Sequence, residues 1–184
     1  IDSAHGDVDR WVRSGAWRSD IPDTAECYYR LYKFGDMHRL IAAYESMLCE
    51  YGSMKEYVRC HATTGIEAVA AICRYFAEHD ASTVVPRNTQ SACKRVCMFL
   101  RWMVRTDSPV DLGLWADIID RRTLIMPLDT HVVQEALRLG LLKSRTASMS
   151  TARRLTDAML EVFPDDPLRG DFALFGLGVD EETT

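Results

Sequence analysis

The sequence has no apolar run long enough to cross a membrane and no signal peptide, which argues against a membrane-spanning or secreted protein. It also lacks a Gly-x-Ser-x-Gly nucleophile elbow, a Walker loop and a dinucleotide fingerprint. The usual evidence for a serine hydrolase, a kinase or a Rossmann enzyme is therefore missing. No Cys-x-x-Cys pair occurs, so we expect the six cysteines to be free thiols in a reducing cytoplasm.

The chain also has no excess of basic residues: its formal net charge is −5 and its pI is about 5.5. Tight non-specific binding of nucleic acid requires clustered lysine and arginine, so the overall charge argues against it. Residues 87–105 are an exception, because they carry five basic residues and no acidic one. This stretch is either a surface that faces nucleic acid or a solvated helix face with salt bridges to acidic residues elsewhere.

No window of strict apolar alternation is long enough for a confident strand, whereas apolar residues recur at helical spacing along the chain. With 184 residues, 47% of them hydrophobic, the chain can bury a core. We therefore predict an all-α fold of at least seven helices, without a sheet, in a single domain over residues 1–184. The first residue is Ile1 rather than Met, which indicates an N-terminally truncated fragment.

Capping residues and glycines predict where several helices begin and end. Asp36 opens a helix that ends at Gly52. Capping boxes, in which Ser or Thr is followed three residues later by Glu, open the next two helices at Ser53 and Thr64. Further helix starts are expected at three positions: Asp111, Ser150 and the pair Asp166–Pro167.

Residues 127–142, PLDTHVVQEALRLGLL, contain the most informative helix. Asp129 stands at its first position, Val132, Val133 and Ala136 share one face, and Gly140 lies where a left-handed residue ends a helix. A helix N-terminus favours negative charge, and capping fixes the direction of the carboxylate. Such a carboxylate is suited to stabilise a short-lived cation. Alternatively, Asp129 is no more than a helix cap.

Residues 84–105, VVPRNTQSACKRVCMFLRWMVR, form a polar loop that leads into a second helix. Lys94 lies in the first turn of that helix. A lysine must be neutral to act as a nucleophile, and a helix N-terminus disfavours the protonated amine. Cys93 and Cys97 lie one helical turn apart beside it. They are either packing residues or, together with His131, metal ligands, and we predict packing.

The two segments together resemble the helix-hairpin-helix DNA glycosylases, the superfamily of endonuclease III and the 8-oxoguanine glycosylases. The strings DTHV and RLGL are similar to the superfamily's DTHVxRxxxRLGL motif, with Gln134 in place of an arginine. The resemblance implies that Asp129 is the catalytic carboxylate and that Lys94 is the amine that attacks the sugar. Residues 86–91 replace the usual Gly-x-Gly hairpin. Residues 106–126 lengthen the interval between the two motifs, as in archaeal 8-oxoguanine glycosylases.

A closer resemblance, from about Tyr28 onward, is to an uncharacterised bacterial family. It is carried by the strings EYGS, SACKR, FLRWMVR, VDLGLW, PLDTH and DFALFGLG. In the last of these, Asp171 occupies a position where glycosylases often have histidine or aspartate. The family resemblance also implies further helices upstream of Ile1.

These resemblances imply a helix-hairpin-helix glycosylase-like fold, with two helical lobes around a cleft and the motif itself in residues 79–105. The implied activity is base excision from double-stranded DNA that carries a damaged base, with AP-lyase chemistry by Lys94 and Asp129. The side chains expected to bind substrate or DNA are Arg87, Asn88, Ser91, Arg95, Trp115 and His131. Trp102, also in this region, is expected in the core.

No cofactor or metal is expected, and no membrane association. The iron–sulfur cluster of endonuclease III is excluded because no cysteine follows Phe163. The alternative to an enzyme is a helical module without catalytic activity that binds nucleic acid or a protein partner. The pairing of Lys94 with Asp129 favours the enzyme, whereas the missing Gly-x-Gly hairpin and the acidic composition favour the module.

Overall fold

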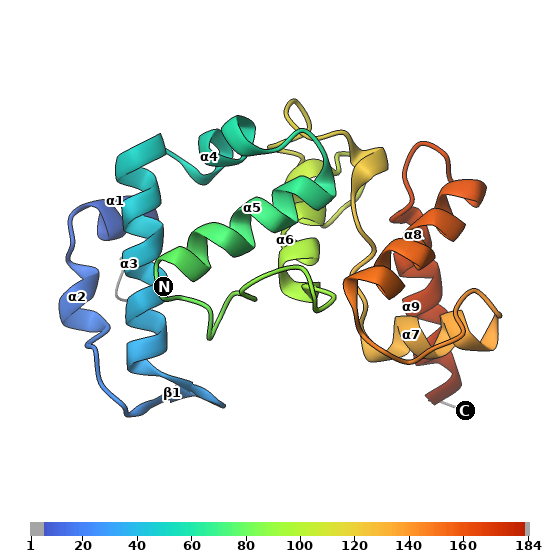
Figure 1. The fold of residues 1–184 in the computed structure, drawn as a ribbon, viewed down its shortest axis with the longest axis horizontal. Coiled ribbons are helices and arrows are strands. Elements are labelled where there is room, and N and C mark those ends of the chain that lie inside the picture. Colours follow the sequence, from blue (N-terminus) through green and yellow to red (C-terminus); the bar gives the residue numbers. More distant parts are fainter. Residues whose placement is uncertain (1–5, 183–184) are drawn as a thin grey trace. The chain divides into compact units, whose positions relative to one another are not determined.

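The computed structural model describes residues 6–182, which are mostly helical (Figure 1). The chain divides into two compact units, one of residues 1–60 and 72–87, the other of residues 61–71 and 88–184. The described helices are α1 (Val8–Arg13), α2 (Trp17–Asp20), α3 (Phe34–Tyr51), α4 (Met54–His61), α5 (Gly65–Glu78), α6 (Lys94–Val104), α7 (Thr130–Arg138), α8 (Met149–Val162) and α9 (Arg169–Glu182). The predominance of helices is thus confirmed.

The first unit is built around α3. It begins at Phe34, two residues before the predicted start, and Asp36 lies in its first turn, where the carboxylate accepts a hydrogen bond from the Lys33 backbone N–H at 2.9 Å. Its end is the predicted Gly52, whose φ of 77° few other residues adopt. The indole of Trp17, in α2, is fully buried, and Arg18 forms an ion pair with Glu45 of α3 at 2.5 Å.

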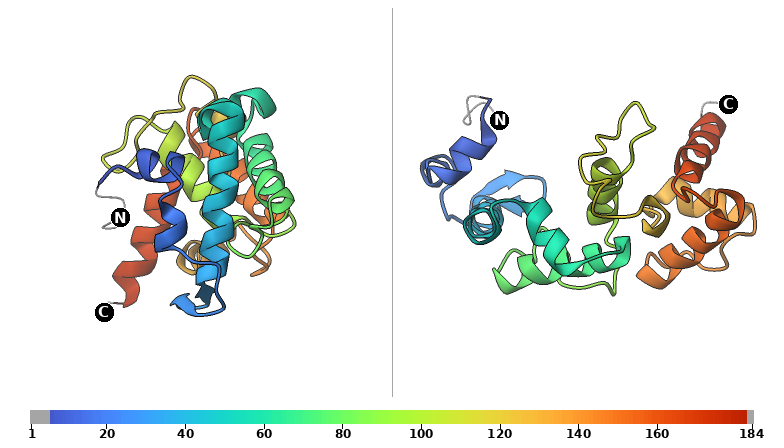
Figure 2. Two further views of the ribbon diagram at one scale, coloured as in Figure 1. Left: turned by 90° about the vertical axis from the view of Figure 1, so that its left-hand side faces the viewer. Right: turned by 90° about the horizontal axis from the view of Figure 1, so that it is seen from above.

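The expectation that the chain has no sheet is wrong at one place. Strands β1 (Cys27–Tyr29) and β2 (Tyr32–Lys33) pair antiparallel just before α3, as Figures 1 and 2 show. Arg30, in the turn between them, has a φ of 54°. The hairpin escaped the sequence analysis because strands of three and two residues are too short to show apolar alternation.

The second unit contains α6, α7, α8 and α9, with α7 packed against α9. The start of α5 also belongs to this unit, where the Gly65 N–H donates to Thr123 Oγ1 at 2.8 Å. Thr123 ends the short 3-10 helix η2 (Arg121–Thr123). The largest fully buried side chains of the unit are Leu100, Ile119, Leu124, Met126, Leu155 and Leu168.

The helix expected to begin at Asp111 is absent. Residues 105–120 form turns that fold back onto the end of α6, where the N–H groups of Leu112 and Trp115 donate to the carbonyls of Trp102 and Met103. Asp111 does not cap a helix, because its carboxylate binds the Arg105 guanidinium at 2.6 Å. The segment thereby satisfies carbonyls that the C-terminus of a helix leaves unpaired.

The helix-hairpin-helix expected over residues 79–105 is found only in its second half. Helix α6 begins at Lys94 as predicted, but residues 79–93 contain turns and no helix, since α5 already ends at Glu78. Two other starts are shifted along the chain. Helix α8 is capped by Ser148 rather than Ser150, and α9 begins at Arg169, after a turn at Asp166.

Candidate active site

Lys94 is the first residue of α6, and the backbone before it is tightly turned. Cys93 adopts a left-handed conformation, with φ 47° and ψ 38°, which costs a non-glycine residue about 1 kcal/mol. Its thiol donates to the carbonyls of Asn88 and Ser91 at 3.3 and 3.4 Å. Both Cys93 and Cys97 are buried, so the prediction that they are packing residues agrees with their surroundings.

Asp129 is the N-cap of α7, as the sequence predicts. Its Oδ1 accepts a hydrogen bond from the Val132 N–H at 2.8 Å, and Gly140, just beyond the helix, has a φ of 74°. Its Oδ2 lies 3.8 Å from Lys94 Nζ. The side chains are 49% exposed at Lys94 and 21% exposed at Asp129, so a ligand can reach both. The structure thus brings these two residues together, each at the N-terminus of its helix.

The pair lies in the wall of a pocket of about 350 Å³. The lining residues are Lys94, Leu128, Asp129, Thr130, Val133, Gln134, Arg145 and Ala147. The apolar side chains of Leu128 and Val133 adjoin two cations and one carboxylate, a combination of apolar surface and few charged groups that is typical of ligand sites. All of these residues belong to the second unit.

The segment between α7 and α8 closes one side of this pocket. The Ala92 N–H donates to the Ala147 carbonyl at 3.2 Å, and Ser91 and Ser148 form an isolated β-bridge. These backbone contacts tie the loop before α6 to the residues before α8. The N-termini of α6, α7 and α8 are therefore neighbours, although they are far apart in the sequence.

A buried network of ion pairs holds α6 beside the pocket. Arg105 binds Asp166 at 2.9 Å and Asp111 at 2.6 Å, and the Asp111 side chain is fully buried. Arg101 pairs with Asp171 in the first turn of α9, and its Nε lies 3.4 Å from Asp111. Buried charges require such partners, because removal from water is costly. The network joins α6 to the turns after it and to the start of α9.

Asp171, which the resemblance singled out, is part of this network. Burial raises the pKa of its carboxyl to about 6, the Arg101 guanidinium opposes that rise, and the negative charge of Asp129 adds to it. The electrostatic interaction of Asp171 with Asp129 connects the network to the pocket. Asp171 is only 6% exposed, so a role in contact with substrate does not fit its position.

The other residues predicted to bind substrate or DNA do not line the pocket. Asn88 and Ser91 lie exposed in the loop before α6, and the Asn88 side chain accepts from the Gln90 N–H at 3.0 Å. Arg95 is exposed on α6 and His131 is partly buried on α7, but neither lines the pocket. Trp115 is only 6% exposed and packs edge to face on Phe99 at 5.2 Å. It is a core residue, contrary to the prediction.

Arg87 is exposed and belongs to the first unit, and its expected role in DNA binding stays a prediction. Trp102, expected in the core, is 42% exposed, and its carbonyl accepts from Leu112. Arg145 also lines the pocket and was not predicted from the sequence. The only signal for it was a short stretch rich in basic residues and hydroxyl groups, KSRTASMS.

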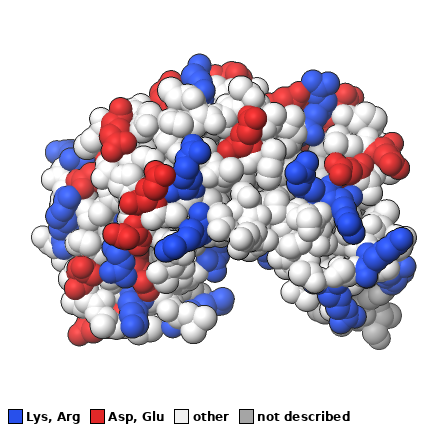
Figure 3. Space-filling view, viewed as in Figure 1, with Lys and Arg blue, Asp and Glu red and all other residues white. Residues whose placement is uncertain are grey.

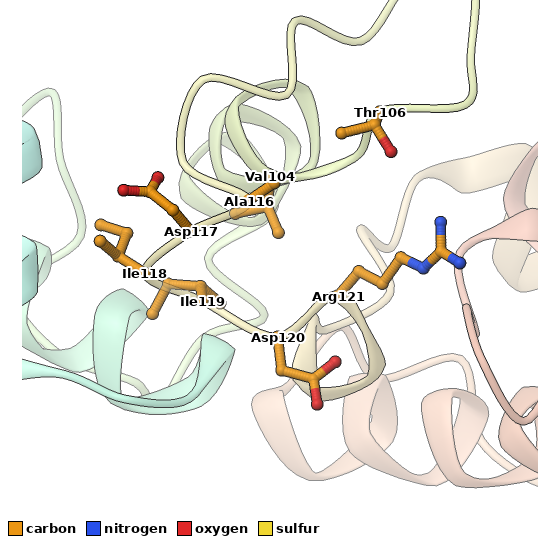
Figure 4. Close-up of a pocket in the computed structure, with 8 residues that line it drawn as sticks. All are labelled: Val104, Thr106, Ala116, Asp117, Ile118, Ile119, Asp120 and Arg121. Carbon is orange, nitrogen blue, oxygen red and sulfur yellow. The ribbon is translucent and has the colours of Figure 1, made fainter.

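A second pocket, of about 440 Å³, lies over the turns after α6 (Figure 4). Its charged groups are already engaged: Arg121 binds Asp107 at 2.7 Å, and Asp120 binds Arg122 at 2.5 Å. In Figure 4 the Arg121 side chain extends away from Asp117 and Asp120. No amine and carboxylate meet there as Lys94 and Asp129 do.

The described residues hold no group of three histidine, cysteine, aspartate or glutamate side chains that would suit a metal ion. Burial also raises the pKa of the Cys97 thiol to about 12, which disfavours the thiolate that a metal would need. Among the residues with described placement, no helix is long and apolar enough to cross a membrane.

Comparison with known proteins shows the family. Residues 3–180 match the model of the family described as "Protein of unknown function (DUF2400)". The chain belongs to the DUF2400 family. No curated protein and no solved structure matches it. The DUF2400 match accounts for nearly the whole chain but assigns no activity, so the likeness to the helix-hairpin-helix glycosylases stays a prediction.

Proposed function

We propose that this DUF2400 protein is a DNA glycosylase with AP-lyase activity. The observation that carries the proposal is the approach of Lys94 Nζ to Asp129 Oδ2, 3.8 Å apart, in the wall of one pocket. The two residues come from the first positions of different helices. An accessible amine next to an accessible carboxylate is the pair that this chemistry requires, and the two residues carry the motifs that resemble the superfamily.

In the proposed reaction, a damaged nucleotide is turned out of the duplex so that its sugar enters the pocket. The neutral amine of Lys94 forms a bond to C1′ while the bond from C1′ to the base breaks, and the base leaves with the bonding electron pair and gains a proton. The Asp129 carboxylate stabilises the positive charge that develops on the sugar. Its position is fixed by the hydrogen bond from Val132.

The second stage cleaves the strand. The sugar ring opens as the nitrogen lone pair forms a C1′=N bond, and O4′ takes up a proton. Loss of a proton from C2′ and of the 3′ phosphate then breaks the C3′–O bond. Water finally hydrolyses the imine and restores Lys94. Asp129 Oδ2 faces Nζ at a distance at which it can receive, through one water, the proton that the Lys94 ammonium must lose.

The test is a borohydride trapping screen with duplexes that contain uracil, 8-oxoguanine, oxidised pyrimidines or an abasic site. Borohydride reduces the imine, so an active enzyme becomes covalently bound to the DNA. We expect an adduct with at least one duplex for the wild-type chain and none for Lys94→Gln. Lys55→Gln, which removes an amine from the first unit, is the matched control. If none of the duplexes gives an adduct, the lyase activity is contradicted.

A further inference from the structure

At least six of the twelve lysine and arginine side chains of the second unit are paired with carboxylates. Arg101 and Arg105 are buried in ion pairs, and Lys94 faces Asp129. Three of the five basic residues in the stretch 87–105 are therefore neutralised by carboxylates. Salt bridges within the protein explain this stretch better than a surface that faces nucleic acid does. Positive charge that is free to meet a ligand must be sought elsewhere.

Positive charge that is free to meet a ligand lies in residues 143–154, which we call the basic segment. This segment runs from the middle of the α7–α8 connection into the first half of α8, and it contains no acidic residue. Its four basic side chains are Lys143, Arg145, Arg153 and Arg154. All four are exposed, and none forms a hydrogen bond or ion pair with another residue of the described part of the chain.

Unpaired positive charge of the second unit is therefore concentrated in this segment; outside it, the exposed Arg169 lies over the Phe163 ring. Elsewhere in the unit, exposed arginines such as Arg121, Arg122 and Arg138 bind neighbouring carboxylates at 2.7, 2.5 and 2.6 Å. The first acidic residue after the basic segment is Asp157, one turn beyond Arg153 on α8. In the space-filling view, basic side chains with no acidic neighbour among the described residues lie over the lower part of the second unit (Figure 3).

The basic segment adjoins the Lys94–Asp129 pocket. Arg145 and Ala147 line that pocket, and the backbone contact from Ala92 to Ala147 fixes the segment against the loop before α6. Hydroxyl groups lie beside the charges, with Ser148 Oγ 2.8 Å from Ser150 Oγ at the start of α8. Guanidinium, ammonium and hydroxyl groups are the side-chain donors that proteins use to bind phosphate.

We infer that the basic segment binds the sugar–phosphate backbone of DNA beside the Lys94–Asp129 pocket. This inference rests on the proposed function and names the surface that positions its substrate. A nucleotide whose sugar lies at Lys94 carries a phosphate on either side of that sugar. Arg145, in the wall of the same pocket, holds one of them, and the other three cations bind phosphates farther along the strand.

Basic side chains without an ion-pair partner are well suited to bind phosphate, because no ion pair within the protein has to be broken first. Each phosphate that a cation neutralises releases counterions, which lowers the slope of log K against log salt concentration by about 0.9. In a chain with a formal net charge of −5, binding depends on the few sites where positive charge is unopposed. We therefore expect the basic segment to account for most of the salt dependence.

The test measures DNA affinity by fluorescence anisotropy between about 50 and about 200 mM KCl, a range that includes physiological ionic strength. The ligands are an undamaged duplex and a duplex that carries an uncleavable abasic-site analogue. For Arg145→Gln we expect the slope to become less negative by about 0.9, and for the variant with all four residues changed to glutamine by about 3.6, one phosphate each. Arg145→Lys keeps the charge and should retain the wild-type slope. Arg10→Gln, an exposed arginine of α1 in the first unit, is the matched control and should change nothing.

Several results would overturn the inference: unchanged affinity and slope in the four-residue variant, no binding of the wild-type chain to duplex DNA, or stronger binding to RNA or an acidic peptide than to DNA. Thermal unfolding shows whether the variants are folded, and exposed substitutions should shift stability by less than about 0.5 kcal/mol. Trapping separates the two proposals. Adducts from a chain whose DNA binding does not depend on the basic segment refute only this inference, whereas segment-dependent binding without adducts refutes only the lyase activity.

Discussion

The Asp129 carboxylate serves helix α7 with one oxygen and faces Lys94 with the other. Oδ1 accepts the Val132 N–H at 2.8 Å, and Oδ2 lies 3.8 Å from Lys94 Nζ. The structural and the proposed catalytic roles of this residue therefore belong to different atoms. Substitutions can separate them, because asparagine keeps an acceptor for the cap but carries no charge.

The first prediction is that Asp129→Asn loses activity without losing stability. The asparagine oxygen still caps α7, so thermal unfolding should be nearly unchanged. Base excision should fall by at least about a hundredfold, because the charge that stabilises the developing cation is gone. Single-turnover excision and a melting curve measure the two effects. As a control, Asp129→Ala should also lose the cap, at about 1 kcal/mol. Full activity in Asp129→Asn would disprove the catalytic assignment.

Lys94→Gln separates chemistry from binding. It removes the amine but keeps most of the length of the side chain, so borohydride trapping should vanish while DNA binding remains. The side chain is about half exposed, and its ion pair with Asp129 is 3.8 Å long, so folding should survive. Peptide mapping of the wild-type adduct should locate the sugar remnant on Lys94. A remnant on Lys143, which belongs to the adjacent basic segment, would identify a different nucleophile.

The buried carboxyl of Asp171 predicts a pH dependence of stability. Its pKa is 3.8 in the unfolded chain and about 6 in the folded chain, mainly because of burial. The folded chain therefore binds this proton more tightly. The resulting stabilisation is complete below about pH 4 and is lost as the pH rises through 6. In Asp171→Asn, which cannot ionise, this fall should be absent. Denaturant unfolding of both proteins between pH 4 and 7 tests it, and parallel curves would contradict it.

The ion pairs of Arg105 predict a large effect from one aspartate and a small one from its neighbour. Asp166 is buried, binds Arg105 at 2.9 Å and accepts from the Leu168 N–H at 3.2 Å. Asp166→Ala leaves the guanidinium without its main partner and should cost about 3–5 kcal/mol. Asp165→Ala, at the exposed position before it, should stay within about 0.5 kcal/mol. Equal losses of unfolding free energy would show that the network contributes little.

Much of the fold follows from interactions between residues three or four positions apart. The reciprocal bonds of Thr64 and Glu67 form as expected, with the Thr64 N–H donating to Glu67 at 3.1 Å and the Glu67 N–H to Thr64 Oγ1 at 3.4 Å. The same holds for the cap of α7 at Asp129 and the left-handed Gly52 after α3. Each of these devices is complete within one turn of chain, so a sequence pattern predicts it.

The wrong predictions for Asp111 and Trp115 have a common cause, which is contact with residues outside the local stretch of chain. Asp111 has the sequence signal of a helix cap, but its carboxylate binds Arg105, and the turns around it bond to the end of α6. Trp115 packs on Phe99 rather than facing a pocket. Tertiary partners decided both cases, and a buried ion pair outweighs the modest free energy of a cap.

In the candidate site, too, some features follow from local sequence and others only from tertiary packing. Helical periodicity and capping placed Lys94 and Asp129 at helix starts, and the resemblance joined them, but neither specifies a distance between two helices. Packing of the second unit brings them to 3.8 Å and adds Arg145 to the same pocket. Which arginines are free is likewise a tertiary property: the partner of Arg101 is Asp171, seventy residues away in the sequence. Local sequence determines helix ends, whereas contacts between distant residues determine which charges meet, because only the folded chain fixes those distances.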